Sequence, residues 1–247
     1  MFDTLQEVID IWKDEPEIHT QIFNTFFDKV QEDEELKKFR DFVEQHEFGY
    51  GDRPYYWMWN LIVRSLPENF RVTEIGIYMG QTISLISLLN KRYNKKGIVY
   101  AITPLEPADD KYSKHHDVDY YKKIQELYAF NKLNGTDLRI IKGLSNDKEI
   151  VSRTNEIAPF DCFYIDGSHN YEIVVSDIQN YTPMVKVGGL VVMDDACLDL
   201  NISDGLIRHN WKGMQSVTQA VNNTIDKDER FKVIFTVGHN KIYRRIK

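Results

Sequence analysis

The chain has 247 residues, of which 42% are hydrophobic and 28% charged, so it can bury one large core but is too short for two ordinary domains. Its 31 Lys and Arg side chains against 38 Asp and Glu give a net charge of -7, which argues against binding to nucleic-acid phosphates or anionic lipid. The two cysteines, Cys162 and Cys197, cannot build a disulfide framework. The N-terminal sequence also lacks the apolar run of a signal peptide or membrane anchor. We therefore expect a soluble, cytoplasmic protein of a reducing compartment.

The first 50 residues differ in charge from the rest. They hold 14 of the 38 acidic side chains and 5 of the 31 basic ones, so this segment carries -9 and the remaining chain +2. Apolar residues recur at helical spacing within residues 5–12, 18–30 and 36–43, which predicts three amphipathic helices with solvated acidic faces. We expect a helical cap over residues 1–50, packed on a domain of residues 51–247.

From residue 70 onward, short β-branched runs alternate with helical stretches, as in parallel α/β proteins. Strands are predicted near 71–75, 98–102, 138–141, 161–165 and 189–193. The helices between them are predicted after Gly80, over 119–133 and 147–156, and from residue 171. The C-terminal runs FKVIFTV and KIYRRI flank a turn and predict a hairpin that adds an antiparallel strand. The pattern predicts a doubly wound α/β sheet, which binds ligands at the carboxyl ends of its strands.

The first predicted strand runs into the loop EIGIYMG, residues 74–80. Two glycines around a strand-to-helix turn, Gly76 and Gly80, let the backbone approach a ligand and leave helix-start N–H groups for an anion. The alternative is that these glycines only permit a tight turn. Their spacing matches neither the dinucleotide fingerprint nor the phosphate loop of NTPases, so the pattern does not favour a nicotinamide enzyme or an NTPase.

Acidic residues follow the fourth and fifth predicted strands. Asp166 and His169 lie where FDCFYIDGSHNYE leaves the fourth strand, and Asp194 and Asp195 end the fifth. If these strands are neighbours, about 4.8 Å apart, the carboxylates converge at one edge. Three acids in one cleft repel unless they share a cation, and oxygen ligands favour magnesium, manganese or calcium. The alternative is that Asp194 or Asp195 caps a helix or points to the opposite face.

A histidine beside such a site has a chemical use, although a single histidine is more often structural. Neutral imidazole, with a pKa of about 6.5, accepts a proton at physiological pH. Opposite a metal that acidifies a hydroxyl, it can act as a general base. We therefore expect His169 to be the catalytic base.

These segments together resemble a known group of enzymes. EIGIYMGQT, KGLSND after the third strand, FYIDGSHNYE after the fourth and GGLVVMDD after the fifth are similar to the ordered motifs of class I S-adenosylmethionine (SAM) dependent methyltransferases. Within that class they resemble the metal-dependent branch of sugar and natural-product O-methyltransferases, such as macrocin O-methyltransferase, with cephalosporin-hydroxylase-type proteins nearby. The resemblance covers roughly residues 47–246 and implies a Rossmann-like seven-stranded sheet whose last strand is antiparallel.

The resemblance also implies cofactor contacts. It places four residues in the first SAM-binding loop, namely Glu74, Gly76, Tyr78 and Gly80, and two near the adenine, Gly143 and Ser145. One position departs from the family pattern. Thr103 stands at the end of the second strand, where these enzymes carry an acid that binds both ribose hydroxyls. Thr103 could make one such hydrogen bond, or Glu106 could reach back from the loop.

The implied reaction is methyl transfer from SAM to a hydroxyl of a small polyol, a sugar or a glycosylated metabolite. By the resemblance, Asp166, Asp194 and Asp195 hold a divalent metal, Mg2+, that lowers the pKa of the hydroxyl, and His169 removes its proton. A metal-dependent glycosyltransferase would explain the acids but not the glycine loop. A non-catalytic scaffold would have no reason to keep four converging polar groups. Assembly into a homo-oligomer is left open.

The segment EFGYGDRPYYWMW, residues 47–59, is rich in aromatic side chains. Aromatic residues dominate cores, so the segment is predicted to pack a helix against the sheet. The alternative is that Tyr50, Arg53 or Tyr55 lines the acceptor pocket. The long connections 104–119 and 197–211 are predicted to act as lids or acceptor-binding walls.

Overall fold

A seven-stranded sheet forms the centre of the computed structural model, which describes residues 2–107, 117–200 and 211–247. The strands are β1 (Arg71–Ile75), β2 (Ile98–Thr103), β3 (Leu138–Lys142), β4 (Phe160–Ile165), β5 (Val185–Met193), β6 (Phe231–Val237) and β7 (Asn240–Arg245). Their order is β3-β2-β1-β4-β5-β7-β6. Neighbouring strands pair in parallel except at β7, which is antiparallel to both β5 and β6. The predicted doubly wound sheet with an antiparallel last strand is confirmed.

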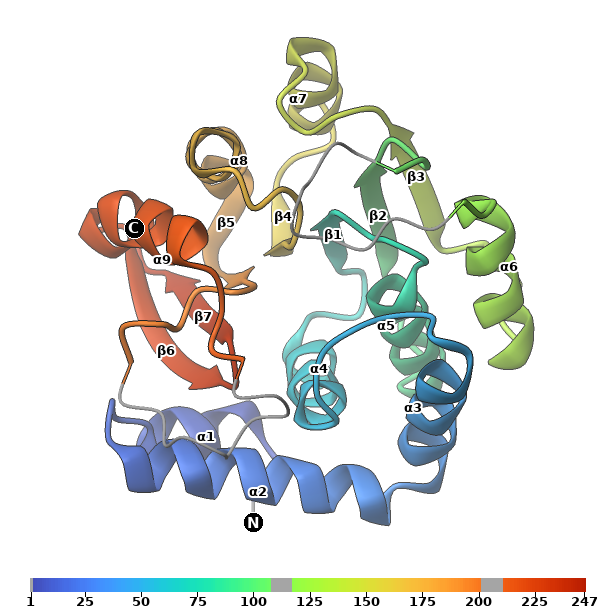
Figure 1. Cartoon of the computed structure of the whole chain (residues 1–247), viewed down its shortest axis with the longest axis horizontal. Helices are drawn as coiled ribbons and strands as arrows, with labels where there is room; N and C mark the ends of the chain where they lie inside the picture. The colour runs from blue at the N-terminus through green and yellow to red at the C-terminus, as the bar shows by residue number, and fades with distance from the viewer. Residues whose placement is uncertain (1, 108–116, 201–210) are drawn as a thin grey trace.

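Helices cover both faces of this sheet (Figure 1). One face carries α4 (Pro54–Ser65), α5 (Gln81–Arg92) and α6 (Tyr120–Phe130), together with the N-terminal α1 (Leu5–Ile11), α2 (Pro16–Glu32) and α3 (Glu34–His46). The other face carries α7 (Lys148–Asn155), α8 (Tyr171–Tyr181) and α9 (Gln215–Asn223). No sequence pattern predicted α9, because only three of its nine residues, Val217, Ala220 and Val221, are apolar.

The strands divide the apolar core into two layers. In β4, Cys162 and Tyr164 belong to the layer under α1–α6, whereas Phe163 and Ile165 belong to the layer under α7–α9. The residues of β5 alternate in the same way. Because both faces are covered, these strands appear in the sequence as nearly continuous apolar runs.

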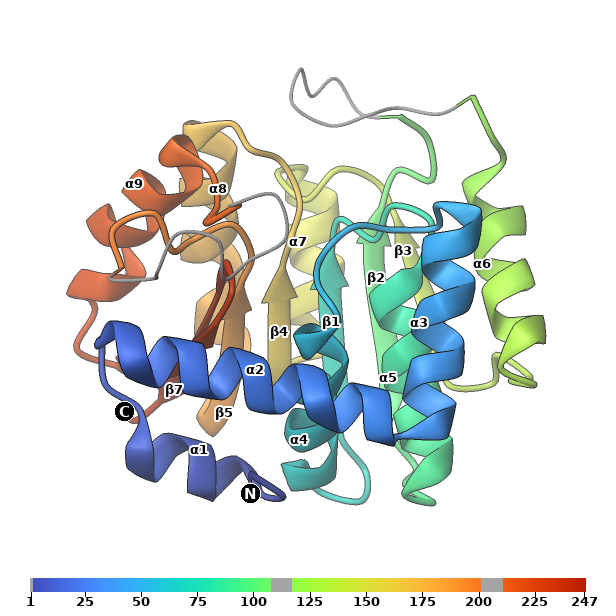
Figure 2. The ribbon, with the colours of Figure 1, turned by 60° about the horizontal axis from the view of Figure 1, so that its bottom comes forward.

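The N-terminal helices share the first of these layers. Phe26 of α2 is fully buried, and its ring centroid lies 6.3 Å from that of Phe2 and 6.5 Å from that of Phe235 in β6. The hydroxyl of Thr236, the next residue of β6, is 3.0 Å from Nδ1 of His19 in α2. Figure 2 shows α2 running across the strands from the β7 side of the sheet to α3. The acidic N-terminal segment therefore packs on the sheet through an apolar face.

The aromatic segment 47–59 leads into α4. Tyr56 and Trp59 are buried, as the packing interpretation predicted. Arg53 is occupied by ion pairs with Asp41 (2.6 Å) and Glu44 (2.5 Å). These contacts leave the guanidinium of Arg53 tied to α3, so it supports the fold at this position.

Two further predictions can be compared with the structure only over the residues that it describes. Among the described residues, each helix is either too short or too polar to cross a membrane. The connections predicted as lids or acceptor-binding walls include residues 108–116 and 201–210, which lie outside the described residues.

Phe26→Ala should destabilise the whole protein rather than a detachable cap, because the ring fills the space between α2 and β6. Loss of a fully buried phenylalanine costs about 3–5 kcal/mol in free energy of unfolding. Urea unfolding followed by tryptophan fluorescence should show a single transition with a lowered midpoint. Phe27→Ala, at the neighbouring residue that is 40% exposed, should change the free energy by only about 0.5 kcal/mol. A separate early transition for Phe26→Ala would show that the N-terminal helices unfold alone.

Candidate active site

The carboxyl ends of five parallel strands form one row. The residue after each of four strands donates its N–H to the neighbouring strand, in the bonds Gly143 to Thr103 O (3.0 Å), Gly76 to Ile102 O (3.1 Å), Asp166 to Ile75 O (3.0 Å) and Asp194 to Ile165 O (3.1 Å). The strand register continues through these bonds, since Ile75 pairs with Ile165 and Ile165 with Met193. Five predicted site residues, Gly143, Thr103, Gly76, Asp166 and Asp194, therefore stand side by side at one edge of the sheet.

The glycine loop adopts a backbone conformation that favours glycine. Gly76 has φ +82° and Gly80 has φ +89°. A Cβ on Gly76 would stand 2.0 Å from the backbone oxygen of Asp166, so the loop passes directly over the end of β4. Gly80 is the N-cap of α5, and the first N–H groups of that helix face the loop. The loop therefore brings backbone donors close to the row of strand ends.

Glu74 lies below this loop in β1 and is 2% exposed. Burial raises the pKa of its carboxyl well above the usual range; a hydrogen bond from Thr82 opposes this rise, and the charge of Asp194 adds to it. Its Oε2 atom has no hydrogen-bond partner among the described residues. A buried acceptor of this kind is costly to leave unpaired, so it is suited to a donor group of a bound ligand.

Tyr78 and Thr103 flank the same loop. Tyr78 has φ +46°, and its ring lies 5.3 Å from that of Tyr50 and 5.8 Å from that of Tyr120. The Thr103 hydroxyl accepts a hydrogen bond from the N–H of Leu105 (3.1 Å). This bond uses one lone pair of the hydroxyl and leaves its proton to be donated, so the ribose contact through Thr103 stays a prediction.

The loop after β3 lies against α8. Gly143 has φ +152°, and the backbone oxygen of Ser145 accepts a hydrogen bond from the Tyr181 hydroxyl (2.6 Å). Asp177 of α8 is 1% exposed. Burial raises its pKa to about 7. No local sequence pattern indicated a buried carboxyl here, because the burial of Asp177 depends on how α8 packs against the loop.

Three carboxyl groups gather where β4 and β5 end. Burial raises the pKa of Asp166 well above its usual range, and the charges of Asp194, Glu74 and Asp195 raise it further. Oδ1 of Asp194 is buried and has no hydrogen-bond partner among the described residues. Carboxylates in such surroundings need a compensating positive charge. The predicted convergence of acids is therefore present in the structure.

Asp195 is held between two rings. Its Oδ2 accepts a hydrogen bond from Nε2 of His169 (3.0 Å), and its Oδ1 accepts one from Nε1 of Trp211 (2.6 Å). Burial would raise the pKa of Asp195, but the hydrogen bond from His169 and the charge of His239 lower it overall. The backbone oxygen of His169 also accepts a hydrogen bond from Ser216 (2.6 Å). His169 is thus oriented by a carboxylate, as a general base requires.

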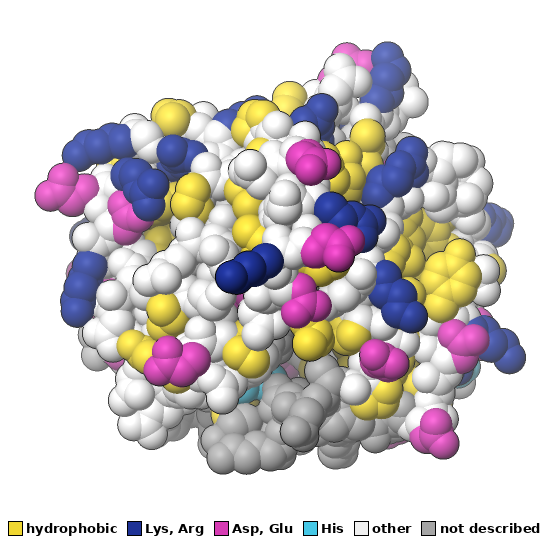
Figure 3. Space-filling model, turned by 90° about the horizontal axis from the view of Figure 1, so that it is seen from above, with side chains coloured by type: hydrophobic (Ala, Val, Ile, Leu, Met, Phe, Trp, Pro, Cys, Tyr) yellow, Lys and Arg dark blue, Asp and Glu magenta, His cyan; other side chains and the backbone are white. Residues whose placement is uncertain are grey.

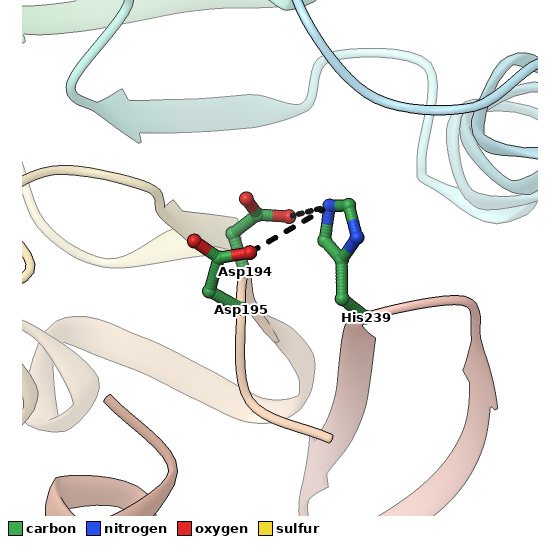
Figure 4. A group of neighbouring side chains, drawn as sticks. All are labelled: Asp194, Asp195 and His239. Carbon is green, nitrogen blue, oxygen red and sulfur yellow. Dashed lines mark ion pairs between the residues drawn. The ribbon is translucent and has the colours of Figure 1, made fainter. Parts of the chain in front are cut away.

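His239 completes the cluster from the β6–β7 turn (Figure 4). Its Nε2 lies 3.4 Å from Oδ1 of Asp194 and 3.9 Å from Oδ1 of Asp195. Burial would lower the pKa of His239, but the charges of Asp194, Asp195 and Asp52 raise it to about 9. Without a metal, the protonated imidazole itself supplies positive charge to the two carboxylates.

The donor atoms that could share a metal differ from the predicted set. Asp194, Asp195 and His239 each offer an atom, and all three atoms lie within 4.8 Å of one another. The third predicted ligand, Asp166, lies outside this group, although it faces the same pocket. The sequence placed His239 in a turn and gave it no role. The predicted antiparallel hairpin could have indicated that His239 lies near the acids. Its strand β7 begins beside the carboxyl end of β5, where Met193 pairs with Lys241.

The molecular surface around α7 and α8 is neither predominantly positive nor predominantly negative. On the face that includes α7 and α8, Lys and Arg side chains lie interspersed with Asp and Glu (Figure 3). The acids of the site are instead gathered in a pocket lined by Asp166, His169, Asp194 and Asp195, together with apolar residues of α8 and α9. The local charge of the site is therefore independent of the net charge of the chain.

Solved structures of several methyltransferases share this Rossmann-like fold. A putative caffeoyl-CoA O-methyltransferase from Staphylococcus aureus is 16% identical, with a TM-score of 0.62 over 91% of this chain and 98% of that one. The O-methyltransferase TomG from Streptomyces achromogenes, solved with SAM, is 17% identical, with a TM-score of 0.59 over 94% and 99%. An O-methyltransferase from Bacillus cereus is 13% identical, with a TM-score of 0.59 over 92% and 100%. At these identities the likeness shows the fold.

The sequence itself identifies the family. Residues 73–196, half of the chain, match the family described as methyltransferase domain, and the chain belongs to that family. It is also 30% identical over 129 residues to an uncharacterized protein of Acanthamoeba polyphaga mimivirus. That alignment covers 52% of each protein, so the chain matches about half the length of this relative. The predicted methyltransferase fold and the membership of a methyltransferase family are confirmed.

Asp177→Asn should change how stability depends on pH. The folded protein keeps the Asp177 proton up to about pH 7, whereas an unfolded aspartate loses it near pH 4. The contribution of Asp177 to the free energy of unfolding is therefore fully present at pH 4 and declines as the pH rises to 7. Urea unfolding at pH 5 and pH 8 should show a smaller decline for Asp177→Asn, by up to roughly 3 kcal/mol.

Glu172→Gln is the matched control for this pH experiment, because Glu172 is an exposed acid on the same helix. It should leave the difference in unfolding free energy between pH 5 and pH 8 unchanged. An unaltered pH dependence in Asp177→Asn would contradict a buried, proton-bearing carboxyl at this position.

Proposed function

We propose that the protein transfers a methyl group from SAM to a hydroxyl of a small polyol, a sugar or a glycosylated metabolite. The observation that carries this proposal is the row of strand ends. It brings the glycine loop of a methyltransferase-family domain beside a cluster of carboxylates and an oriented histidine. This arrangement supports both cofactor binding and removal of a proton at adjacent positions.

The row offers complementary groups for SAM, which supplies an activated methyl group on a sulfonium. The close backbone turn at Gly76 and the helix start at Gly80 can bind the carboxylate of its methionine part. The unpaired Oε2 of Glu74 can accept a hydrogen bond from its ammonium group. The loop that contains Gly143 and Ser145 is assigned to the adenine end.

The carboxylates are suited to a divalent metal, whose chemistry would be to lower the pKa of the acceptor hydroxyl. Oδ1 of Asp194 has no hydrogen-bond partner among the described residues, and Asp195 lies next to it in the chain. Asp166 faces the same pocket. Asp166, Asp194 and Asp195 would therefore hold the ion, and its charge would offset theirs.

His169 is assigned as the base that receives the hydroxyl proton. Asp195 holds the imidazole through the 3.0 Å bond to Nε2 and would stabilise the imidazolium that forms. Ser216 fixes the backbone of the same residue. The rigid placement of the ring would favour proton transfer in the same geometry at each turnover.

The acceptor class rests on the resemblance and on one exposed aromatic ring. Tyr50 is 56% exposed, and its ring lies tilted beside that of Tyr78 in the glycine loop, with the centroids 5.3 Å apart. An open aromatic face of this kind suits the apolar face of a sugar ring. TomG, which shares the fold, is involved in tomaymycin synthesis, which supports a small-molecule acceptor.

SAM should stabilise the protein in a thermal-shift experiment. At a concentration of 100 times its Kd, it should raise Tm by roughly 5–10 °C. Glu74→Gln should lose most of this shift because the amide binds an ammonium more weakly. Glu68→Gln, at an exposed glutamate before β1, should retain it. Stabilisation by a nucleotide sugar with metal, in the absence of any SAM effect, would instead favour the glycosyltransferase alternative.

His169→Ala should lower turnover at saturating SAM by about 10²–10⁴-fold, the usual contribution of a general base. The measurement is transfer of labelled methyl from SAM to a panel of nucleotide-linked sugars and glycosylated metabolites. The affinity for SAM should be unchanged. His46→Ala, at an exposed histidine of α3, serves as the control with normal turnover. Full turnover in His169→Ala would remove this residue from the mechanism.

A further inference from the structure

We propose that Nε2 of His239 is a ligand of the divalent metal, which makes the site a mixed nitrogen and oxygen site rather than an all-carboxylate one. The inference rests on the metal use in the proposed function. It goes beyond that function because it adds a ligand from the β6–β7 hairpin and changes the class of metal that the site favours.

The distances around His239 suit a shared ion. Its Nε2 lies 3.4 Å from Oδ1 of Asp194 and 3.9 Å from Oδ1 of Asp195. Two ligands at about 2.1 Å from one metal stand roughly 3.0 Å apart in an octahedron and roughly 3.4 Å apart in a tetrahedron. The first distance already matches such a pair, and the second requires a shift of about half an ångström. The three side chains point toward one another, two from the segment that follows β5 and one from the β6–β7 turn (Figure 4).

The surroundings of His239 hold its ring in the orientation that ligation needs. The hydroxyl of Tyr55 is 2.8 Å from Nδ1 and 3.2 Å from Nε2. Along the shorter contact, a proton on Nδ1 can be donated to the phenol oxygen, which leaves the lone pair of Nε2 for an ion shared with the carboxylates. Metal-bound histidines use their second nitrogen in this way. A Cβ on Gly238, which has φ +55°, would stand 2.5 Å from the Tyr55 hydroxyl. The turn and Tyr55 are therefore in close contact.

The backbone ties this turn to the carboxylates. The N–H of Ala196 donates to the backbone oxygen of His239 (3.0 Å), and Ala196 directly follows Asp195. The His239 residue is 7% exposed. The imidazole is thus fixed relative to Asp194 and Asp195 by the sheet itself, which gives a preformed set of donors.

A nitrogen ligand changes the preferred metal. Carboxylate sites suit Mg2+ and Ca2+, whereas imidazole favours transition metals, for which affinities rise along the series from Mn2+ to Cu2+. We therefore expect Mn2+ and later divalent ions to bind more tightly than the Mg2+ expected from the carboxylates alone. His239→Asn should remove most of that preference.

The test uses Mn2+ with the full chain and no SAM or acceptor. Electron spin-echo envelope modulation on the Mn2+ complex should show nitrogen coupling that changes when the histidines carry nitrogen-15. His239→Asn should abolish this coupling and weaken Mn2+ binding at least 10-fold, with a smaller loss for Mg2+. Tyr55→Phe should keep the coupling and weaken binding by about 10-fold, as loss of an orienting partner does.

His19→Asn is the matched control. His19 is as deeply buried, at 4% exposed, and its ring contacts Asp14 (2.8 Å) and Thr236 of the same hairpin. This variant should retain both the nitrogen coupling and the Mn2+ affinity. It separates loss of a ligand from a general effect of removing a buried histidine.

Two results would overturn the inference. One is Mn2+ binding without nitrogen coupling, with the affinity of His239→Asn equal to that of the wild type. The other is no Mn2+ binding to the folded wild type. SAM binding, measured separately by calorimetry without metal, distinguishes the two proposals. SAM binding without Mn2+ binding would contradict the role of His239 as a metal ligand but leave the proposed methyltransferase function intact. Nitrogen-coupled Mn2+ binding without SAM binding would support the ligand and contradict the proposed function.

Discussion

The register of the parallel strands determines where every group of the candidate site lies. Hydrogen bonds from the residue after each strand extend the sheet by one step beyond its regular end. That step places Gly76, Asp166 and Asp194 next to one another at the spacing of adjacent strands. A slip of one residue in β4 or β5 would turn these side chains to the opposite face and separate them. The packing of the apolar layers on both faces disfavours such a slip, because it would exchange the side chains of the two layers and disrupt the packing of each.

The site balances like charges that would otherwise oppose folding. The charge of Asp194 raises the pKa of both Glu74 and Asp166, which burial already raises, whereas the carboxylate of Asp195 is stabilised by hydrogen bonds from His169 and Trp211. The acids of the site thus differ in their partners. Asp195 has two hydrogen-bond donors, whereas Oδ1 of Asp194 has no hydrogen-bond partner among the described residues and faces Nε2 of His239 at 3.4 Å.

Much of the fold could be predicted from the sequence, but only part of the site. The strands were predictable because a sheet covered on both faces needs apolar runs, and the motifs after β1, β4 and β5 follow directly from them. The role of His239 could not be predicted from its own neighbours, since a turn residue acquires its surroundings from pairing between β5 and β7. The hydrogen bond between Trp211 and Asp195 likewise depends on tertiary structure that brings the two residues together, and no local sequence pattern predicts it. The helix α9 could not be predicted because only three of its residues are apolar.

The position of β7 between β5 and β6 has a consequence for the order in which the protein assembles. Among the described strands, β6 pairs with β7 alone, so the hairpin joins the sheet through the pairing of β7 with β5. That pairing joins residues about 50 positions apart in the chain, and pairings between distant segments form slowly. His239 lies in the turn of this hairpin, so its imidazole reaches the carboxylates only when β7 pairs with β5. Completion of the carboxylate and imidazole cluster therefore depends on the last strand of the chain.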